Sequence, residues 1–76
     1  MIKNFELEKK ISILVDQFNS KNYIKVIEGS KKIISENNQL PLIYNLLGAS
    51  YSLIDKHNEA IMSYLNAFDL DPNNEE

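Results

Sequence analysis

Apolar residues recur at intervals of three and four in four separate segments of this chain, which is the spacing that places side chains on one face of an α-helix. Leu7, Ile11, Leu14 and Phe18 form such a face in the first segment. No segment alternates between apolar and polar residues as a half-buried strand would. We therefore expect an all-α protein.

Short polar stretches separate the four segments. Residues 19–22 read Asn-Ser-Lys-Asn and residues 37–39 read Asn-Asn-Gln, and these residue types favour turns and helix caps. Pro41 suits the first turn of a third helix, and Asp55 is a candidate N-cap for a fourth helix that ends at Asp71-Pro72. Because each connection is short, consecutive helices should be antiparallel neighbours. The expected architecture is two stacked antiparallel helix hairpins.

The second half of the chain repeats the first half at a spacing of 34 residues. The paired positions carry residues of similar type, namely Ile13 and Leu47, Val26 and Ala60, Ile27 and Ile61, and Ile33 and Ala67. Internal repetition at this interval is the signature of the tetratricopeptide repeat. We therefore expect the residues that define that family to be present in this chain.

Residues 41–74 resemble the tetratricopeptide pattern W-x2-L-G-x2-Y…A-x3-F…A…P. Tyr44 and Tyr64 replace the tryptophan and the phenylalanine, and the direct matches are Leu47, Gly48, Tyr51, Ala60, Ala67 and Pro72. Residues 7–40 form a degenerate repeat, with larger residues where the pattern has small ones. The resemblance implies a single domain over residues 1–76, folded as a tetratricopeptide-like α-solenoid fragment, with Gly48 in contact with Ala60.

The composition restricts the chemistry that is open to the chain. There is no cysteine, which excludes disulfides and thiolate metal sites, and the one histidine, His57, cannot form a histidine cluster. No serine has a histidine partner at a workable spacing. We therefore predict no catalytic residue, no metal site and no cofactor, and a protein that is not an enzyme. The absence of arginine removes bidentate recognition of phosphates and base edges, so nucleic acid is not an expected partner.

The net charge of −3 is unevenly distributed. Residues 1–40 hold seven lysines and five acidic residues, whereas residues 41–76 hold one lysine and six acidic residues. The longest early apolar run is only Ile13-Leu14-Val15. A secretory signal and a membrane span both need a longer apolar stretch. We expect a cytoplasmic protein that has no contact with a membrane.

The resemblance also implies a partner-binding groove on the concave face, lined by the first helix of each hairpin. The groove residues are Ile11, Val15, Phe18, Leu42, Asn45, Ala49, Ser52 and Leu53, with Glu8 and Asn19 beside them. No cation lies among these positions, so we expect a protein or peptide partner that presents an apolar or amphipathic helical segment. The alternative is that Ile11, Val15 and Phe18 are core residues covered by residues 1–5.

The fourth helix carries a second apolar stripe, formed by Ile61, Leu65 and Phe68. A helix that is apolar on two sides is usually packed against neighbours on both sides. We therefore predict self-association into a homo-oligomer, and the opposite charges of the two halves favour a head-to-tail or swapped arrangement. An alternative is that the chain is the amino-terminal repeat region of a longer protein, such as a repeat-bearing glycosyl- or sulfotransferase, because it stops where a third repeat would begin.

Overall fold

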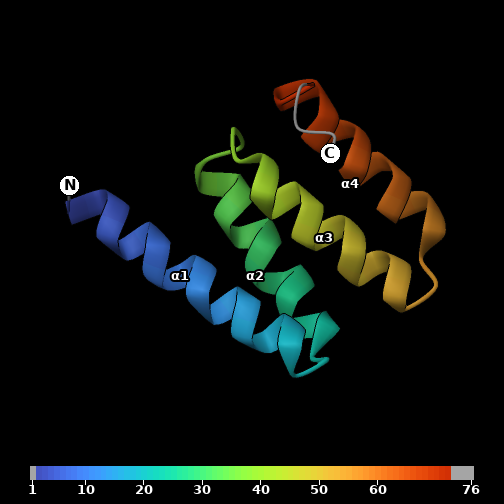
Figure 1. The fold of residues 1–76 in the computed structure, drawn as a ribbon, viewed down its shortest axis with the longest axis horizontal. Helices are drawn as coiled ribbons and strands as arrows, with labels where there is room; N and C mark the ends of the chain where they lie inside the picture. Colours follow the sequence, from blue (N-terminus) through green and yellow to red (C-terminus); the bar gives the residue numbers. More distant parts are fainter. Residues whose placement is uncertain (1, 73–76) are drawn as a thin grey trace.

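The computed structural model describes the backbone of residues 2–72 and the side chains of residues 5–72. Four α-helices follow one another: α1 (Ile2–Asn19), α2 (Tyr23–Glu36), α3 (Pro41–Leu53) and α4 (His57–Leu70). They lie side by side in chain order, each antiparallel to the one before, so that α1 and α4 occupy opposite ends of the row (Figure 1). The described residues include no strand. The prediction of an all-α protein built from two antiparallel hairpins is confirmed.

The helix boundaries recur at the 34-residue interval seen in the sequence. The first helices of the two hairpins end at Asn19 and Leu53, and the second helices begin at Tyr23 and His57 and end at Glu36 and Leu70. Only the start of α1 departs from this interval. The first helix extends to Ile2 although its apolar periodicity begins at Leu7, because a helix can continue without core contacts, and Phe5 is largely exposed.

Both hairpins turn through the same backbone conformation. Lys21 and Asp55, which are 34 residues apart, have left-handed φ angles of 64° and 66°. The N–H of Asn22 donates to the carbonyl oxygen of Gln17 (2.9 Å), and the N–H of Lys56 donates to that of Tyr51 (2.8 Å). These bonds span six residues around a left-handed residue, as in a Schellman helix end. The prediction that Asp55 caps α4 is wrong, because Asp55 terminates α3 and the N-cap position is held by Lys56 without a side-chain hydrogen bond.

The core lies between α1, α2 and α3, and α4 is added on one side. Leu14, Ile33 and Ile43 form a buried cluster, against which Leu7, Ile11, Ile34, Leu40 and Leu46 pack. Within the described residues α4 packs on α3 alone, and this is the most extensive helix contact in the structure. α1 packs on α2 and touches α3 at a few positions. No helix of the described chain is both long and apolar enough to cross a membrane.

In each hairpin a glycine lies where a side chain of the other helix comes close to the backbone. A Cβ added to Gly48 would lie 2.9 Å from the ring of Tyr64, so α3 and α4 meet through a small residue on α3 and a large one on α4. The expected neighbour of Gly48 was Ala60, but the Tyr64 ring is nearer. In the first hairpin the sizes are reversed, because a Cβ on Gly29 of α2 would lie 2.6 Å from Cδ2 of Leu14 on α1. Each hairpin therefore needs one glycine, on opposite helices.

Candidate interaction surfaces

α3 presents an uncharged face to the surface. None of the residues of this helix carries a charge, although α2 and α4 make most of its contacts with other helices. Leu42 and Leu53, near its two ends, are 51% and 55% exposed, and the predicted groove residues Asn45, Ala49 and Ser52 between them are half-buried. The two half-exposed leucines and the absence of charge between them make this face a candidate interaction surface.

The α1 part of the predicted groove is less open than the α3 part. Ile11 packs against the core cluster, and the ring of Phe18 lies edge-on to that of Tyr23 with the centroids 5.4 Å apart. Val15 is exposed. Residues 2–5 continue α1 in the same helix and so do not fold back over these side chains, whereas Met1 lies outside the described residues. Ile11 and Phe18 therefore hold α1 in place, and Val15 is the α1 residue that is free to meet a partner.

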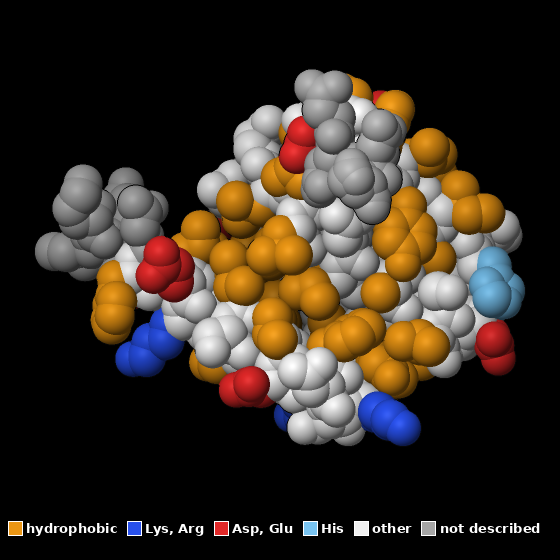
Figure 2. Space-filling model, in the orientation of Figure 1, with side chains coloured by type: hydrophobic (Ala, Val, Ile, Leu, Met, Phe, Trp, Pro, Cys, Tyr) orange, Lys and Arg blue, Asp and Glu red, His pale blue; other side chains and the backbone are white. Residues whose placement is uncertain are grey.

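Hydrophobic side chains gather over the middle of one face of the molecule, and the acidic and basic side chains in the same view lie mainly at its edge (Figure 2). Because α1 touches α3, the α1 and α3 parts of the predicted groove lie on neighbouring helices. We call the surface formed by Val15, Leu42, Asn45, Ala49, Ser52 and Leu53 the α3 face.

The outer side of α4 is a second apolar surface. Ile61, Leu65 and Phe68, the residues predicted for self-association, are all more than half exposed. Met62 beside them is also exposed and was missed by the sequence analysis, because it lies one step around the helix from the regular stripe. We call Ile61, Met62, Leu65 and Phe68 the α4 stripe.

A groove of about 500 Å³ runs between α1 and α2 and is lined by these two helices only. Its floor is apolar, with Ile13, Leu14 and Ile33, and its sides carry three lysines, Lys10, Lys25 and Lys32, together with Glu28. Sequence reasoning did not predict this groove. The one available signal was the spacing of Lys10, Ile13, Leu14 and Gln17, which shares the period of the buried face.

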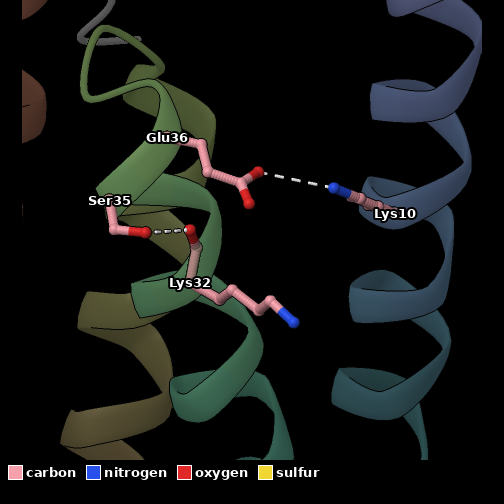
Figure 3. A network of polar contacts seen from close by, with 4 residues as sticks. All are labelled: Lys10, Lys32, Ser35 and Glu36. Carbon is pink, nitrogen blue, oxygen red and sulfur yellow. Dashed lines mark hydrogen bonds and ion pairs between the residues drawn. The ribbon is translucent and has the colours of Figure 1, made fainter.

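Polar contacts at the edge of this groove are few. Lys10 of α1 lies 3.4 Å from the Glu36 carboxylate of α2, and the Ser35 hydroxyl donates to the Lys32 carbonyl oxygen at 2.6 Å (Figure 3). Lys10 and Glu36 are both about half exposed, so the pair contributes little to stability. The Lys25 and Lys32 ammonium groups make no ion pair with the described residues. Two lysines at the groove are therefore available to an incoming acidic group.

The remaining chemical candidates in the described chain do not assemble. His57 lies at the start of α4 with its Nε2 3.7 Å from an Asp55 carboxylate oxygen, and both side chains are largely exposed. Residues 5–72 contain no group of three or more side chains arranged to hold a metal ion. Comparisons with protein-family models, with curated proteins and with solved structures found no match.

Proposed function

We propose that this protein is a tetratricopeptide-like binding module that holds an amphipathic or apolar helix of a partner protein against the α3 face, without catalysis. The observation that supports this proposal is the helix α3 itself, which has no charged residue and leaves Leu42 and Leu53 half exposed. Such a surface loses little solvation when a partner covers it. We retain the cytoplasm as the expected compartment.

The chemistry of the α3 face favours a helical partner over an extended one. The backbone N–H and C=O groups within α1 and α3 are bonded inside their own helices, so they offer no edge with which an extended peptide could pair. The polar side chains of this face, Asn45 and Ser52, are too few to satisfy an extended backbone. A helix satisfies its own backbone and needs only apolar contacts. From Leu42 to Leu53 the stripe is about 16 Å long, or three helical turns.

The same surface disfavours an acidic peptide tail. None of the α3-face residues is a lysine, so nothing there would compensate for the loss of hydration around a carboxylate. Three large apolar side chains, those of Val15, Leu42 and Leu53, are available instead. Burying an exposed side chain of this size fully stabilises a complex by about 1.5–3 kcal/mol, and these are already half-buried. Together these three side chains contribute less than the entropic cost of association, so we expect weak affinity, and the partner helix must also contact Asn45, Ala49 and Ser52.

Fluorescence anisotropy with two labelled peptides tests this proposal. One probe is a designed amphipathic helix with leucines at positions i, i+3, i+4 and i+7, and the other is an unstructured acidic peptide. We expect the helix to bind and the acidic peptide not to bind. Leu53→Glu should weaken helix binding at least tenfold, because a carboxylate would be desolvated against an apolar stripe.

Ile24→Glu is the matched control. Ile24 is as exposed as Leu53, at 55% each, but it lies on α2, so its replacement should leave the affinity unchanged. Binding of the acidic peptide with a steep decrease at high salt would contradict the proposal. Equal losses for Leu53→Glu and Ile24→Glu would also contradict it, since they would show that binding is not located on the α3 face.

A further inference from the structure

The α1–α2 groove and the α4 stripe carry opposite charges. The groove has Lys10, Lys25 and Lys32 along its sides and Glu28 as its acidic residue. In contrast, α4 contains no lysine, and its acidic residues are Glu59 and Asp69. Asp69 lies on the exposed side of the helix, next to Leu65 in the helical projection. Apolar residues occupy the centre of both surfaces, so the two are complementary in charge and alike in polarity.

The 34-residue register relates the α4 stripe to a surface that is already buried inside the chain. Ile61, Leu65 and Phe68 are the equivalents of Ile27, Lys31 and Ile34 of α2. That side of α2 packs on α3: Ile27 is buried, Ile34 packs against the core cluster, and the Lys31 ammonium lies 5.9 Å from the centre of the Tyr51 ring. The stripe that α2 buries against α3 is thus exposed on α4.

The α1 side of the groove is related to α3 by the same 34-residue register. Its α1 residues Lys10, Ile13 and Gln17 are the equivalents of Tyr44, Leu47 and Tyr51 of α3. Tyr51 is one of the α3 residues that α2 reaches within the chain, through Lys31. Within the described residues, no helix packs on these α1 positions in the way that α2 packs on α3. Ile13 is accordingly 52% exposed. The α4 stripe is therefore the counterpart of the α2 side of the interface that joins the hairpins, and the α1 wall of the groove includes, at Gln17, the counterpart of its α3 side.

We propose that copies of this chain join head to tail, with the α4 stripe of one copy seated in the α1–α2 groove of the next. Ile61, Leu65 and Phe68 then cover Ile13 and the other apolar residues of the groove, while Asp69 approaches Lys25 and Lys32. The contact is heterologous, because two different surfaces meet, and each added copy leaves one groove and one stripe open. Assembly continues with concentration instead of stopping at a dimer.

Sedimentation velocity of the intact chain over a range of micromolar concentrations tests the proposal. We expect the average mass to rise beyond that of a dimer as concentration increases, and to fall with added salt, because salt screens the lysine–carboxylate attraction. A monomer at every concentration, or a dimer that does not grow, would overturn the proposal.

Two single variants then separate the halves of the contact. Phe68→Glu removes the stripe and Ile13→Glu removes the groove, and each should raise the dissociation constant about 30-fold, as the loss of a central interface residue does. Both side chains are more than half exposed, so folding should survive, and circular dichroism checks this. Mixing the two variants should restore a tight one-to-one complex that does not grow, since one intact stripe meets one intact groove. If the stripe instead met another stripe, Ile13→Glu would still self-associate, and the mixture would form no such complex.

Exchange of charges gives an independent measurement. Asp69→Lys and Lys32→Glu should each weaken assembly, and a mixture of the two variants should recover part of the loss, because the exchanged charges attract again. Leu53→Glu, which alters the α3 face, is the control and should leave assembly unchanged. Failure of assembly with intact binding of the amphipathic helix would refute the head-to-tail contact alone, and the reverse result would refute the proposed function alone.

Discussion

Replacement of Gly29 by alanine tests the packing of the first hairpin, because helix propensity and packing predict opposite effects. At an exposed position inside a helix, this change stabilises a protein by about 1 kcal/mol. At Gly29 the new Cβ would lie 2.6 Å from Cδ2 of Leu14, well inside the usual carbon–carbon contact of about 3.5–4 Å. Leu14 is only 3% exposed and belongs to the core cluster, so its Cδ2 has to shift within that cluster to make room for the new Cβ.

The expected net effect is a loss of stability. Overpacking a well-packed site costs about 1–3 kcal/mol, and the gain of about 1 kcal/mol in helix propensity offsets part of it. We therefore expect Gly29→Ala to lower the free energy of unfolding by about 1 kcal/mol. Ser12→Ala is the control, because Ser12 is exposed in the middle of α1 and should show a small gain of about 0.5 kcal/mol from propensity alone.

Urea unfolding followed by circular dichroism, at protein concentrations low enough to avoid association, measures both effects. Leu14→Ala alone should cost about 2–5 kcal/mol. In the double variant the alanine at position 29 occupies part of the vacated space, so the two changes should be coupled by about 0.5–3 kcal/mol. The reasoning fails if Gly29→Ala stabilises the protein as much as propensity predicts, or if the two changes are additive.

Three further changes follow from the backbone and the buried polar groups, and the same urea titrations measure them. Lys21→Gly should stabilise the protein by about 0.5–1 kcal/mol. The φ angle of this residue is 64°, which costs a non-glycine residue about 1–2 kcal/mol, and the greater entropy that glycine loses on folding cancels part of the gain. A loss of stability would contradict this. Ser50→Ala should stabilise by about 1 kcal/mol, since its buried hydroxyl has no hydrogen-bond partner among the described residues, and an unfavourable change would show that the hydroxyl is satisfied. Glu36→Ala should change stability by less than about 0.5 kcal/mol, because the Lys10–Glu36 pair is exposed; a larger loss would mean that the pair holds the hairpin together.

Much of the fold could be predicted from local signals. The polar stretches at residues 19–22 and 37–39 lie where α1 ends and α2 begins and ends, and Pro41 is the first residue of α3. These boundaries are encoded near each end, by polar breaks and by Pro41 and Pro72, so a single sequence is enough to place them. The extension of α1 to Ile2 had no such signal, because exposed residues can continue a helix without any apolar pattern.

Contacts between helices were harder to predict than the helices themselves. Gly48 was expected to meet Ala60, yet the ring of Tyr64, four residues further on, is nearer. Periodicity tells which side of α4 faces α3, but it does not fix how far the two helices slide along each other. Four residues correspond to about one helical turn, or roughly 5.4 Å, so a shift of one turn exchanges the two partners without changing the face.

The α1–α2 groove could not be predicted for a related reason. Lys25 and Lys32 have the sequence pattern of a solvated helix face, and they become the sides of a groove only because Leu14 and Gly29 bring α1 and α2 together at one level. The α3 face, in contrast, consists of six of the eight groove residues that the family resemblance implies. Leu42 and Leu53 are exposed there, and partner binding at this face stays a proposal.

In the proposed assembly, the two surfaces are separate, so binding and assembly would be controlled independently. Most of the α3 face lies on α3, in the middle of the row of helices. The proposed head-to-tail contact instead uses Ile13 of α1 and Phe68 of α4, the helices at the two ends of the row. Because no residue belongs to both surfaces, each copy added to the chain brings another open α3 face. A partner with two amphipathic helices could then bind two faces at once, and its apparent affinity would rise with assembly although no single contact changes. Phe68→Glu should abolish this rise while preserving the affinity for a single helix, whereas Leu53→Glu should abolish binding of both partners in an assembly that still forms.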